Sequence, residues 1–302
     1  MRIKVSFVLA AVIVLSAAGW LVMNHPSKKS ELVKAAPSSP SSVSTTSQLD
    51  ERTDSPSGTP NARQDFAPEP PSYLMNFRRV KALADGGDVV ALRQLSEIYE
   101  SCSLYSANPI DYEEGVRKLA ELNRDLKAAA SMRMVASSVA ARCNLLSAEI
   151  PGKSAAKAAS GTLNAAAIKG DLAANIKIAA TSDRPLSSRE LDTLVDAVRA
   201  ADDPSAIFAL GALMGIGAPS DSQRYSSVSG SQLWGQSWEI AACRLGANCS
   251  SGLLMENICL NFGACSYSSY DQFIIEGLLS PADRPTLEAN VNEIASLIRD
   301  DR

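Results

Sequence analysis

The chain has 302 residues and is mildly acidic, with 29 basic residues, 33 acidic residues and a formal net charge of −4. This balance argues against nucleic acid as a partner, because a phosphate backbone requires a basic face. It also argues against docking of the chain's body on anionic lipid. The single histidine, His25, lies close to the N-terminus. No Ser-His-Asp or Cys-His catalytic system can therefore be built in the rest of the chain.

An uncharged apolar segment of 19 residues runs over residues 5–23, directly after two basic residues. As a signal anchor, this segment would span a bilayer as one helix, which needs about 20 apolar residues. As a cleaved signal peptide, it would be cut near Ala18. Because the apolar run continues past that site through Trp20, we favour the anchor and predict a transmembrane helix over residues 1–23.

Residues 24–72 are rich in serine and contain eight of the fifteen prolines. Their few apolar residues are scattered, so this segment cannot bury enough surface to offset the entropy of ordering it. We predict a disordered linker here that holds the folded body, residues 73–302, away from the membrane.

Hydrophobic periodicity in residues 73–302 is helical almost throughout, without convincing strand patterns. The longest run lies between Asp111 and Ser147, where Gly115 is the only residue that disfavours a helix, and Pro151-Gly152 ends it. We therefore predict an all-α domain of irregular helical hairpins, with a short α-solenoid as the more regular alternative. Shorter helices are expected over Val89–Glu100, Ala155–Ala167, Leu172–Ala180, Ser188–Ala200, Ser205–Met214, Gln232–Leu245, Leu253–Leu260, Tyr270–Leu278 and Pro285–Ile298.

Three segments of the body align without gaps, at residues 82–95, 165–178 and 197–210. Each reads as an apolar helix end, a glycine or aspartate, a second aspartate, and an alanine three residues later. This order predicts a short helix–helix turn, because glycine adopts the left-handed conformation that ends a helix and aspartate caps the next helix. A partial fourth copy at 241–249 would place Gly246 at a turn. The residues in these places are Gly87, Asp88 and Ala91, then Gly170, Asp171 and Ala174, then Asp203, Pro204 and Ala206.

This Gly-Asp turn and the alanine that follows it resemble the tetratricopeptide-like family of bacterial helical repeats. The resemblance covers about half of the body and implies paired helices that stack into a solenoid. It also implies a binding scaffold rather than an enzyme. The copies begin 83, 32 and 44 residues apart, whereas family members repeat about every 34 residues. Irregular hairpins without a solenoid therefore stay open as the alternative.

All six cysteines lie downstream of the apolar segment, and four of them form two C-x5-C motifs, at 243–249 and 259–265. Each motif spans the end of a predicted helix, which can bring its two Cα atoms within disulfide range. A helix between Cys249 and Cys259 would hold those two residues about 15 Å apart. We therefore predict the disulfides Cys102–Cys143, Cys243–Cys249 and Cys259–Cys265.

These cysteines suit structural disulfides better than a metal or redox site. Zinc sites favour shorter cysteine spacings and often include histidine, and a thioredoxin-like site requires C-x-x-C, which the sequence lacks. Disulfides persist in oxidising compartments. We therefore expect a single-pass protein of a bacterial inner membrane with its body in the periplasm, or a periplasmic protein if the segment is cleaved. No cofactor is expected.

The polar segment between Ile216 and Trp238 differs from the helices around it. It leads into Trp234 and Trp238, four residues apart on one predicted helix face, with Arg224 and Tyr225 nearby. Because Trp, Tyr and Arg are enriched at interface hot spots, these four residues are the candidate interaction surface. The alternative is that both tryptophans fill the core.

Motifs of known catalytic sites are absent from the sequence. Glycines at 211–217 follow a predicted helix and not a strand, which argues against a nucleotide-binding loop. We therefore expect no catalytic residues and favour a non-catalytic, membrane-tethered domain that binds envelope proteins as a scaffold. An envelope enzyme that acts on peptidoglycan through paired carboxylates is the alternative, and an immunity-type protective binder is a further one. The acidic residues considered for such an enzyme are Glu97, Glu100, Glu239 and Glu256.

Overall fold

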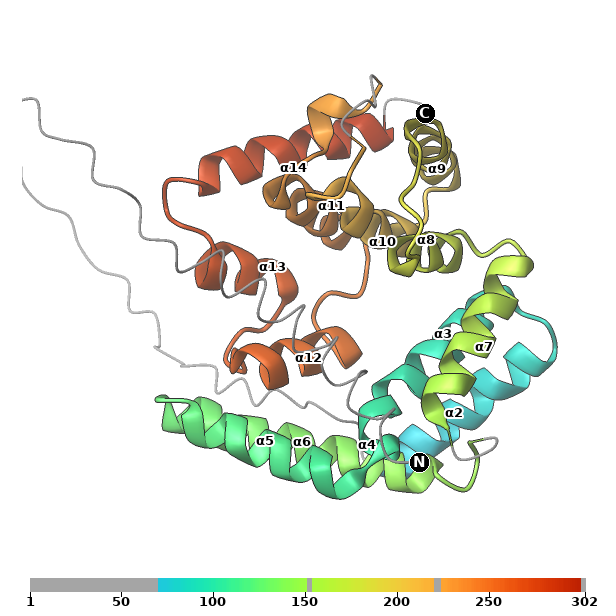
Figure 1. Cartoon of the computed structure of the whole chain (residues 1–302), viewed down its shortest axis with the longest axis vertical. Helices are drawn as coiled ribbons and strands as arrows, with labels where there is room; N and C mark the ends of the chain where they lie inside the picture. The colour runs from blue at the N-terminus through green and yellow to red at the C-terminus, as the bar shows by residue number, and fades with distance from the viewer. Residues whose placement is uncertain (1–69, 151–153, 220–223, 300–302) are drawn as a thin grey trace, which may run out of the picture. The chain divides into compact units, whose positions relative to one another are not determined.

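Helices make up most of the described chain. The computed structural model describes residues 70–150, 154–219 and 224–299. Within these ranges it contains thirteen α-helices and no strand, which confirms the predicted all-α class (Figure 1). The predicted transmembrane helix and residues 24–69 of the predicted linker lie outside the described residues. In the ranges that are described, no helix has both the length and the apolar character needed to cross a membrane.

Most of the helices are shorter than five turns. The first begins at Pro70, three residues before the boundary predicted from composition. The helices are α2 (Pro70–Asp85), α3 (Val89–Ser101), α4 (Ser103–Ala107), α5 (Pro109–Leu122), α6 (Leu126–Leu146), α7 (Ala155–Ile168), α8 (Leu172–Thr181), α9 (Ser188–Ala201), α10 (Pro204–Met214), α11 (Gln232–Arg244), α12 (Gly252–Phe262), α13 (Tyr270–Gln272) and α14 (Arg284–Arg299). A 3₁₀ turn, η2 (Ser226–Val228), precedes α11, and a π-helical segment, η3 (Phe273–Leu278), follows α13.

Two clusters of buried apolar side chains form the interior. The first is built mainly on α2, α3, α6 and α7, with Phe77, Leu95, Met132 and Leu146 among its members. The second is built mainly on α9, α10, α11 and α14, with Leu191, Leu210, Trp238 and Leu287 among its members. Helix α8 contributes to both, because Ala174 packs in the first cluster and its neighbour Ala173 in the second.

The three predicted repeat turns are confirmed. Gly87 and Gly170 both have a φ of 94°, in the left-handed region, and Asp202, with a φ of 49°, takes the same place in the third copy. The aspartate after each of these residues caps the next helix, as predicted. The backbone N–H groups that donate to Asp88, Asp171 and Asp203 are those of Ala91, Ala174 and Ser205.

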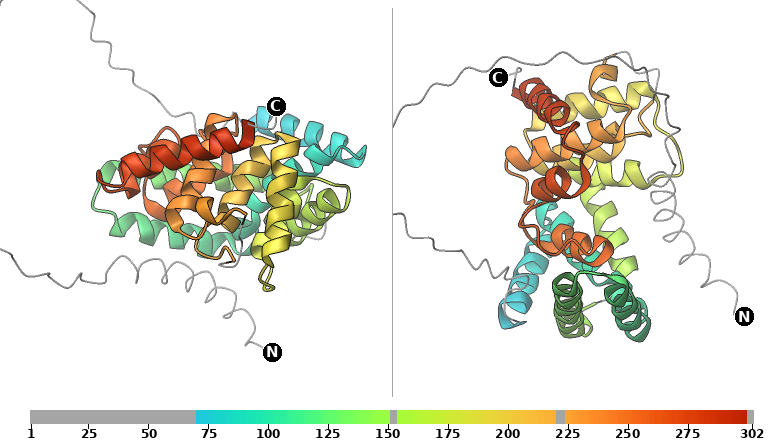
Figure 2. Two further views of the ribbon diagram at one scale, coloured as in Figure 1. Left: turned by 90° about the horizontal axis from the view of Figure 1, so that it is seen from above. Right: turned by 90° about the vertical axis from the view of Figure 1, so that its left-hand side faces the viewer.

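The alanines of the three copies are buried, which allows the close packing that the sequence predicts. Helix α3 packs against α2 and α7, and α10 packs against α8 and α11. The fourth partial copy also turns at its glycine, since Gly246 has a φ of 112° directly after α11. The first of these turns places α2 and α3 side by side, as Figures 1 and 2 show.

The long helix expected between Asp111 and Ser147 is instead two helices, α5 and α6, and this prediction was wrong. The chain turns at Asn123, whose side chain accepts a hydrogen bond from the backbone of Asp125 at 2.9 Å. Asp125 then caps α6 by accepting from the backbone N–H of Lys127 at 2.8 Å. Gly115, the expected weak point, lies inside α5. Two short polar side chains therefore reverse the chain, since each offers the backbone a hydrogen bond outside the helix.

The π-helical segment η3 is a second difference from the sequence prediction. One α-helix was expected over Tyr270–Leu278, but regular α-helix covers only Tyr270–Gln272, and Phe273–Leu278 is π-helical.

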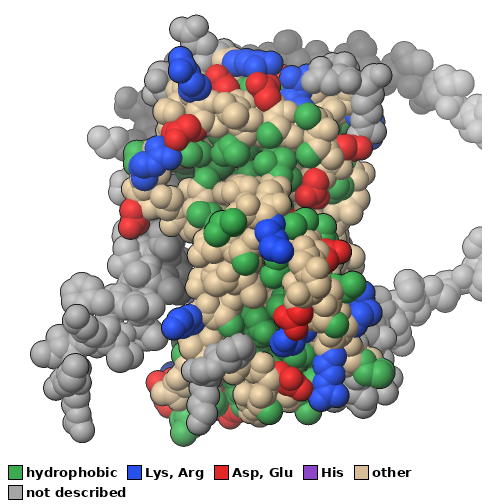
Figure 3. Space-filling view, turned by 90° about the vertical axis from the view of Figure 1, so that its right-hand side faces the viewer, with side chains coloured by type: hydrophobic (Ala, Val, Ile, Leu, Met, Phe, Trp, Pro, Cys, Tyr) green, Lys and Arg blue, Asp and Glu red, His purple; other side chains and the backbone are tan. Residues whose placement is uncertain are grey.

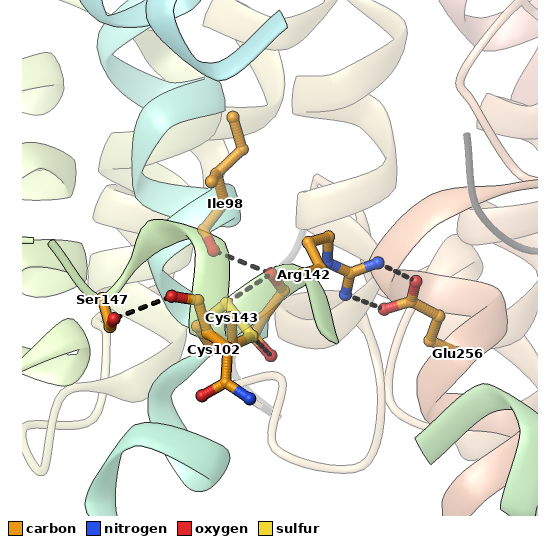
Figure 4. The surroundings of a disulfide bond; sticks show 8 residues. Ile98, Cys102, Arg142, Cys143, Ser147 and Glu256 are labelled. Carbon is orange, nitrogen blue, oxygen red and sulfur yellow. Dashed lines mark hydrogen bonds and ion pairs between the residues drawn. A yellow bond between two sulfur atoms is a disulfide. The ribbon is translucent and has the colours of Figure 1, made fainter. Parts of the chain in front are cut away.

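The six cysteines form the three predicted disulfides. The Cα–Cα distances are 5.4 Å for Cys102–Cys143, 5.5 Å for Cys243–Cys249 and 4.2 Å for Cys259–Cys265. Helix α12 begins three residues after Cys249 and contains Cys259, so most of the chain between these two cysteines is helical, as the pairing argument required. Cys102–Cys143 joins the end of α3 to α6 (Figure 4).

Candidate functional site

The predicted interaction surface is largely buried. Trp238 has no exposed surface and lies in the second core cluster, where its indole Nε1 donates to the backbone oxygen of Val228 at 2.9 Å. Tyr225 is only 3 % exposed. The structure therefore removes Trp238 and Tyr225 from the surface and places them in the core. Arg224 stays exposed, and Trp234 is half-buried.

Arg224 and Tyr225 are brought together by Asp196 of α9. The Tyr225 hydroxyl donates to one carboxylate oxygen of Asp196 at 2.5 Å, and Arg224 contacts the other at 2.6 Å. Burial, followed by the hydrogen bond to Asp196, raises the pKa of Tyr225. These contacts attach the loop before α11 to α9. Arg224 and Tyr225, predicted as parts of a binding surface, therefore make contacts within the fold.

The glycines at 211–217 allow two helices to approach closely. A Cβ atom on Gly211 would lie 2.8 Å from the backbone oxygen of Gly235 and 2.5 Å from Cγ of Glu239. Helices α10 and α11 could not keep this separation with any larger side chain at 211. Residues 211–214 lie inside α10 and the chain leaves the helix after Met214, so this stretch is a helix followed by a loop, as predicted.

The four acidic residues considered for an enzyme lie in different surroundings. Glu256 is buried and forms two hydrogen bonds with Arg142, at 2.5 and 2.7 Å (Figure 4). Glu97 contacts Lys177 at 2.7 Å, and Glu100 is exposed. Glu256 and Glu97 are therefore each held in an ion pair.

Glu239 is the candidate acid with the most altered environment. Burial raises its pKa to about 7, although a hydrogen bond donated by the Tyr270 hydroxyl partly opposes this. A carboxyl group with such a pKa can exchange protons near neutral pH. Among the described residues, no second carboxylate contributes to this shift. Within the same ranges, no cluster of His, Cys, Asp and Glu could hold a metal ion.

A hollow of about 170 Å³ lies between α8, α9 and α10. Its wall includes Ala180 of α8, Pro185 and Leu186 of the loop after it, and Ala212 and Leu213 of α10. Small-molecule sites usually have about 300–1,000 Å³, so this hollow suits a single inserted side chain better. We name it the α8–α10 hollow.

The neighbourhood of the α8–α10 hollow is partly apolar and exposed. Ile216, which follows α10, is 74 % exposed, and Arg184 lines the opening in an ion pair with Glu190. Figure 3 views the molecule from the side on which α7 and α9 lie in Figure 1, and shows hydrophobic side chains exposed between charged ones on this face. The hollow joins residues from three helices, so no local pattern in the sequence indicates it.

A second exposed apolar feature lies at the turn between α5 and α6. Leu122 and Leu126 are 79 % and 81 % exposed. The usable sequence signal was Asn123 and Asp125 between them, because these residue types favour turns and helix caps over helix interiors. The prediction of one continuous helix concealed it.

Comparison with protein-family models, with curated proteins and with solved structures finds no match to this chain, so the candidate sites are interpreted from its own residues.

Proposed function

We propose that the chain is a non-catalytic binding module of a bacterial cell envelope. Residues 5–23 anchor it in the inner membrane, and residues 73–302 lie in the periplasm, where the partner is another envelope protein. The three disulfides support an oxidising compartment for the body. Tetratricopeptide-like stacking of the helix pairs remains part of this proposal.

The observation that carries the proposal is the α8–α10 hollow. It offers about 170 Å³, lined by apolar side chains of α8 and α10 and by polar groups that include Ser182 and Arg184, which is room for one anchoring side chain of a partner. Interfaces often depend on such an anchor, packed in a small pocket and surrounded by weaker contacts. Exposed Ile216 and the guanidinium of Arg184 would supply part of that rim. Nothing in the described residues favours the peptidoglycan-directed enzyme or the protective binder over this reading.

Filling the hollow tests this function. Ala212 is exposed and lines the hollow, so Ala212→Trp should occupy it without disturbing either core. Ala156→Trp, at an exposed alanine of α7, is the matched control. Full-length chains would be crosslinked in the cell envelope, purified and analysed by quantitative mass spectrometry.

We expect protein neighbours of the wild-type chain to persist in Ala156→Trp and to fall about tenfold or more in Ala212→Trp, the loss typical of a truncated hot spot. Recovery of no specific neighbour with the wild-type chain would reject the binding function. Equal recovery with both variants would reject the hollow as the binding site.

A further inference from the structure

The turn between α5 and α6 presents two leucines to solvent. Leu122 ends α5 and Leu126 begins α6, and each is about four-fifths exposed, at 79 % and 81 %. Only Asn123, Arg124 and Asp125 separate them. In the right-hand view of Figure 2, which faces this turn, α5 and α6 lie side by side below α12. Isolated exposed leucines need no explanation, but two at the end of one hairpin form a local apolar surface.

The end of α12 packs against this turn. Gly263, directly after α12, packs so closely on the turn that a Cβ atom there would lie 2.2 Å from Nδ2 of Asn123. The preceding residue, Phe262, is 63 % exposed. The Cys259–Cys265 disulfide fixes this segment, and Cys265 Sγ lies 3.7 Å from the backbone oxygen of Ala128 in α6. We name Leu122, Leu126 and Phe262 the turn patch.

Unpaired cations surround the turn patch. Arg124 and Lys127 are exposed, and neither forms an ion pair with any residue that the structure describes. The carboxylate of Asp125, between them, is directed to the backbone N–H of Lys127 as the cap of α6. Asp125 keeps its negative charge in this role, so Arg124 and Lys127 leave the turn with a small excess of positive charge beside apolar side chains, although the whole chain carries a net charge of −4.

We propose that the turn patch inserts into the interface of a lipid bilayer that contains anionic phospholipids. Leucine and phenylalanine side chains enter the boundary between headgroups and acyl chains, while nearby Lys and Arg contact anionic headgroups. The apolar and cationic groups of this turn lie within a few residues of one another, as that arrangement requires. The local charge overrides the expectation, drawn from the net charge, that the body avoids anionic lipid.

The proposed membrane anchor would favour this contact. If residues 5–23 span a bilayer, the predicted linker keeps the body within reach of that bilayer and raises its effective concentration there, even though it lets the body stand away from the surface. The inference uses helices other than those of the α8–α10 hollow, so either proposal can fail without the other.

Photocrosslinking from the turn tests the inference in the full-length chain. Leu122→benzoylphenylalanine would be reconstituted in vesicles of phosphatidylcholine with phosphatidylglycerol, and in vesicles of phosphatidylcholine alone. Ile168→benzoylphenylalanine is the control, because Ile168 is a lone exposed residue, 86 % accessible, beside a lysine at the end of α7. Adducts would be identified as lipid or protein by mass spectrometry.

We expect lipid adducts from position 122 in the vesicles that contain phosphatidylglycerol, and few from position 168. Adding Arg124→Gln and Lys127→Gln should weaken the attraction about 30-fold in total, with a matching loss of adducts. Equal lipid labelling at the two positions, or equal labelling in both kinds of vesicle, would overturn the proposal. Adducts of position 122 mainly with protein would also overturn it, and would identify a second copy or another protein as the occupant.

Discussion

Arg93 of α3 donates from its Nε atom to both carboxylate oxygens of Asp171, each 3.1 Å away, at the start of α8. Both side chains are buried. Asp171 also caps α8, since its carboxylate accepts from the backbone N–H of Ala174 at 2.8 Å. One carboxylate therefore ends a repeat turn and neutralises a buried guanidinium on another helix.

Asp171→Ala should consequently be far more destabilising than the loss of a helix cap alone. The substitution removes the cap and leaves the charge of Arg93 without its closest partner, with Glu97 and Asp203 at 4.0 Å. Removing one member of a buried pair typically costs about 3–5 kcal/mol. We expect a loss of about that size in the free energy of unfolding, measured by urea denaturation.

Asp88→Ala is the matched control for that prediction. Asp88 occupies the same place in the first repeat turn and caps α3, but it is exposed. Loss of a cap alone costs about 1 kcal/mol. Equal losses in the two variants would show that the contact with Arg93 contributes nothing.

The buried pair of Arg142 and Glu256 joins α6 to α12 and should behave as a coupled unit. Its two hydrogen bonds measure 2.5 and 2.7 Å, and the Arg142 guanidinium lies 5.1 Å from the centre of the Tyr73 ring. Glu256→Leu should cost about 3–5 kcal/mol, because it leaves a buried guanidinium unpaired. Adding Arg142→Met should recover most of that loss, since an apolar pair needs no charge compensation. A double variant as unstable as Glu256→Leu alone would contradict this account.

The three disulfides should differ in their contribution to stability. Cys102–Cys143 closes a separation of 41 residues, whereas Cys259–Cys265 closes one of 6. If the gain comes from restricting the unfolded chain, the first contributes about 4 kcal/mol and the second about 2. Urea denaturation of the two paired Cys→Ala variants measures both values. The reverse order would show that local contacts outweigh chain entropy here.

Features that depend on neighbouring residues could be predicted from the sequence. Gly87 ends one helix through its own backbone preference, and Asp88 starts the next through its own capping hydrogen bond. The cysteine pairing followed the same logic, since the helix between Cys249 and Cys259 excludes that pair by its length alone. The all-α class likewise follows from periodicity along each stretch.

Features that depend on distant residues could not be predicted. Nothing near Trp238 in the sequence says which helices surround it, so its residue type left an exposed hot spot and a position in the core both open. Nor does the sequence pair Arg142 with Glu256, which lie 114 positions apart. The α8–α10 hollow was missed for this reason too. The turn at Asn123 was missed for a different reason. Asn123 and Asp125 indicate a turn locally, but the apolar stripe on both sides of them favoured one continuous helix.

Glu239 should make the protein less stable as pH rises toward neutrality. Its pKa is about 7 in the folded state, against 4.5 for an unperturbed glutamate. The folded state therefore binds this proton more tightly than the unfolded state does. The stabilisation is fully present below about pH 4.5 and is lost as pH rises to about 7, with a total change of up to about 3 kcal/mol.

Glu239→Gln should abolish that slope, because glutamine keeps a neutral side chain of the same size at every pH. Stability between pH 5 and 7 would be measured by urea denaturation at a series of pH values. Glu190→Gln is the control. Hydrogen bonds from Arg184 and from Ser187 lower the Glu190 pKa to about 2, so its contribution is lost only as pH falls below about 4.5. An unchanged slope in Glu239→Gln would assign the effect to another group.

Substitutions of two helical glycines by alanine should have opposite effects. At Gly211, the added Cβ would lie 2.5 Å from Glu239 Cγ and 2.8 Å from the oxygen of Gly235, so α10 and α11 would have to separate. Overpacking of this kind costs about 1–3 kcal/mol. At Gly115, inside α5, a Cβ would meet no atom within 4 Å. Gly115→Ala should therefore stabilise the protein by about 0.5–1 kcal/mol, because alanine loses less backbone entropy on folding. Thermal or urea denaturation of the two variants measures the change in the free energy of unfolding for each. Destabilisation of equal size in both would contradict the close approach of α10 and α11 as the reason for glycine at 211.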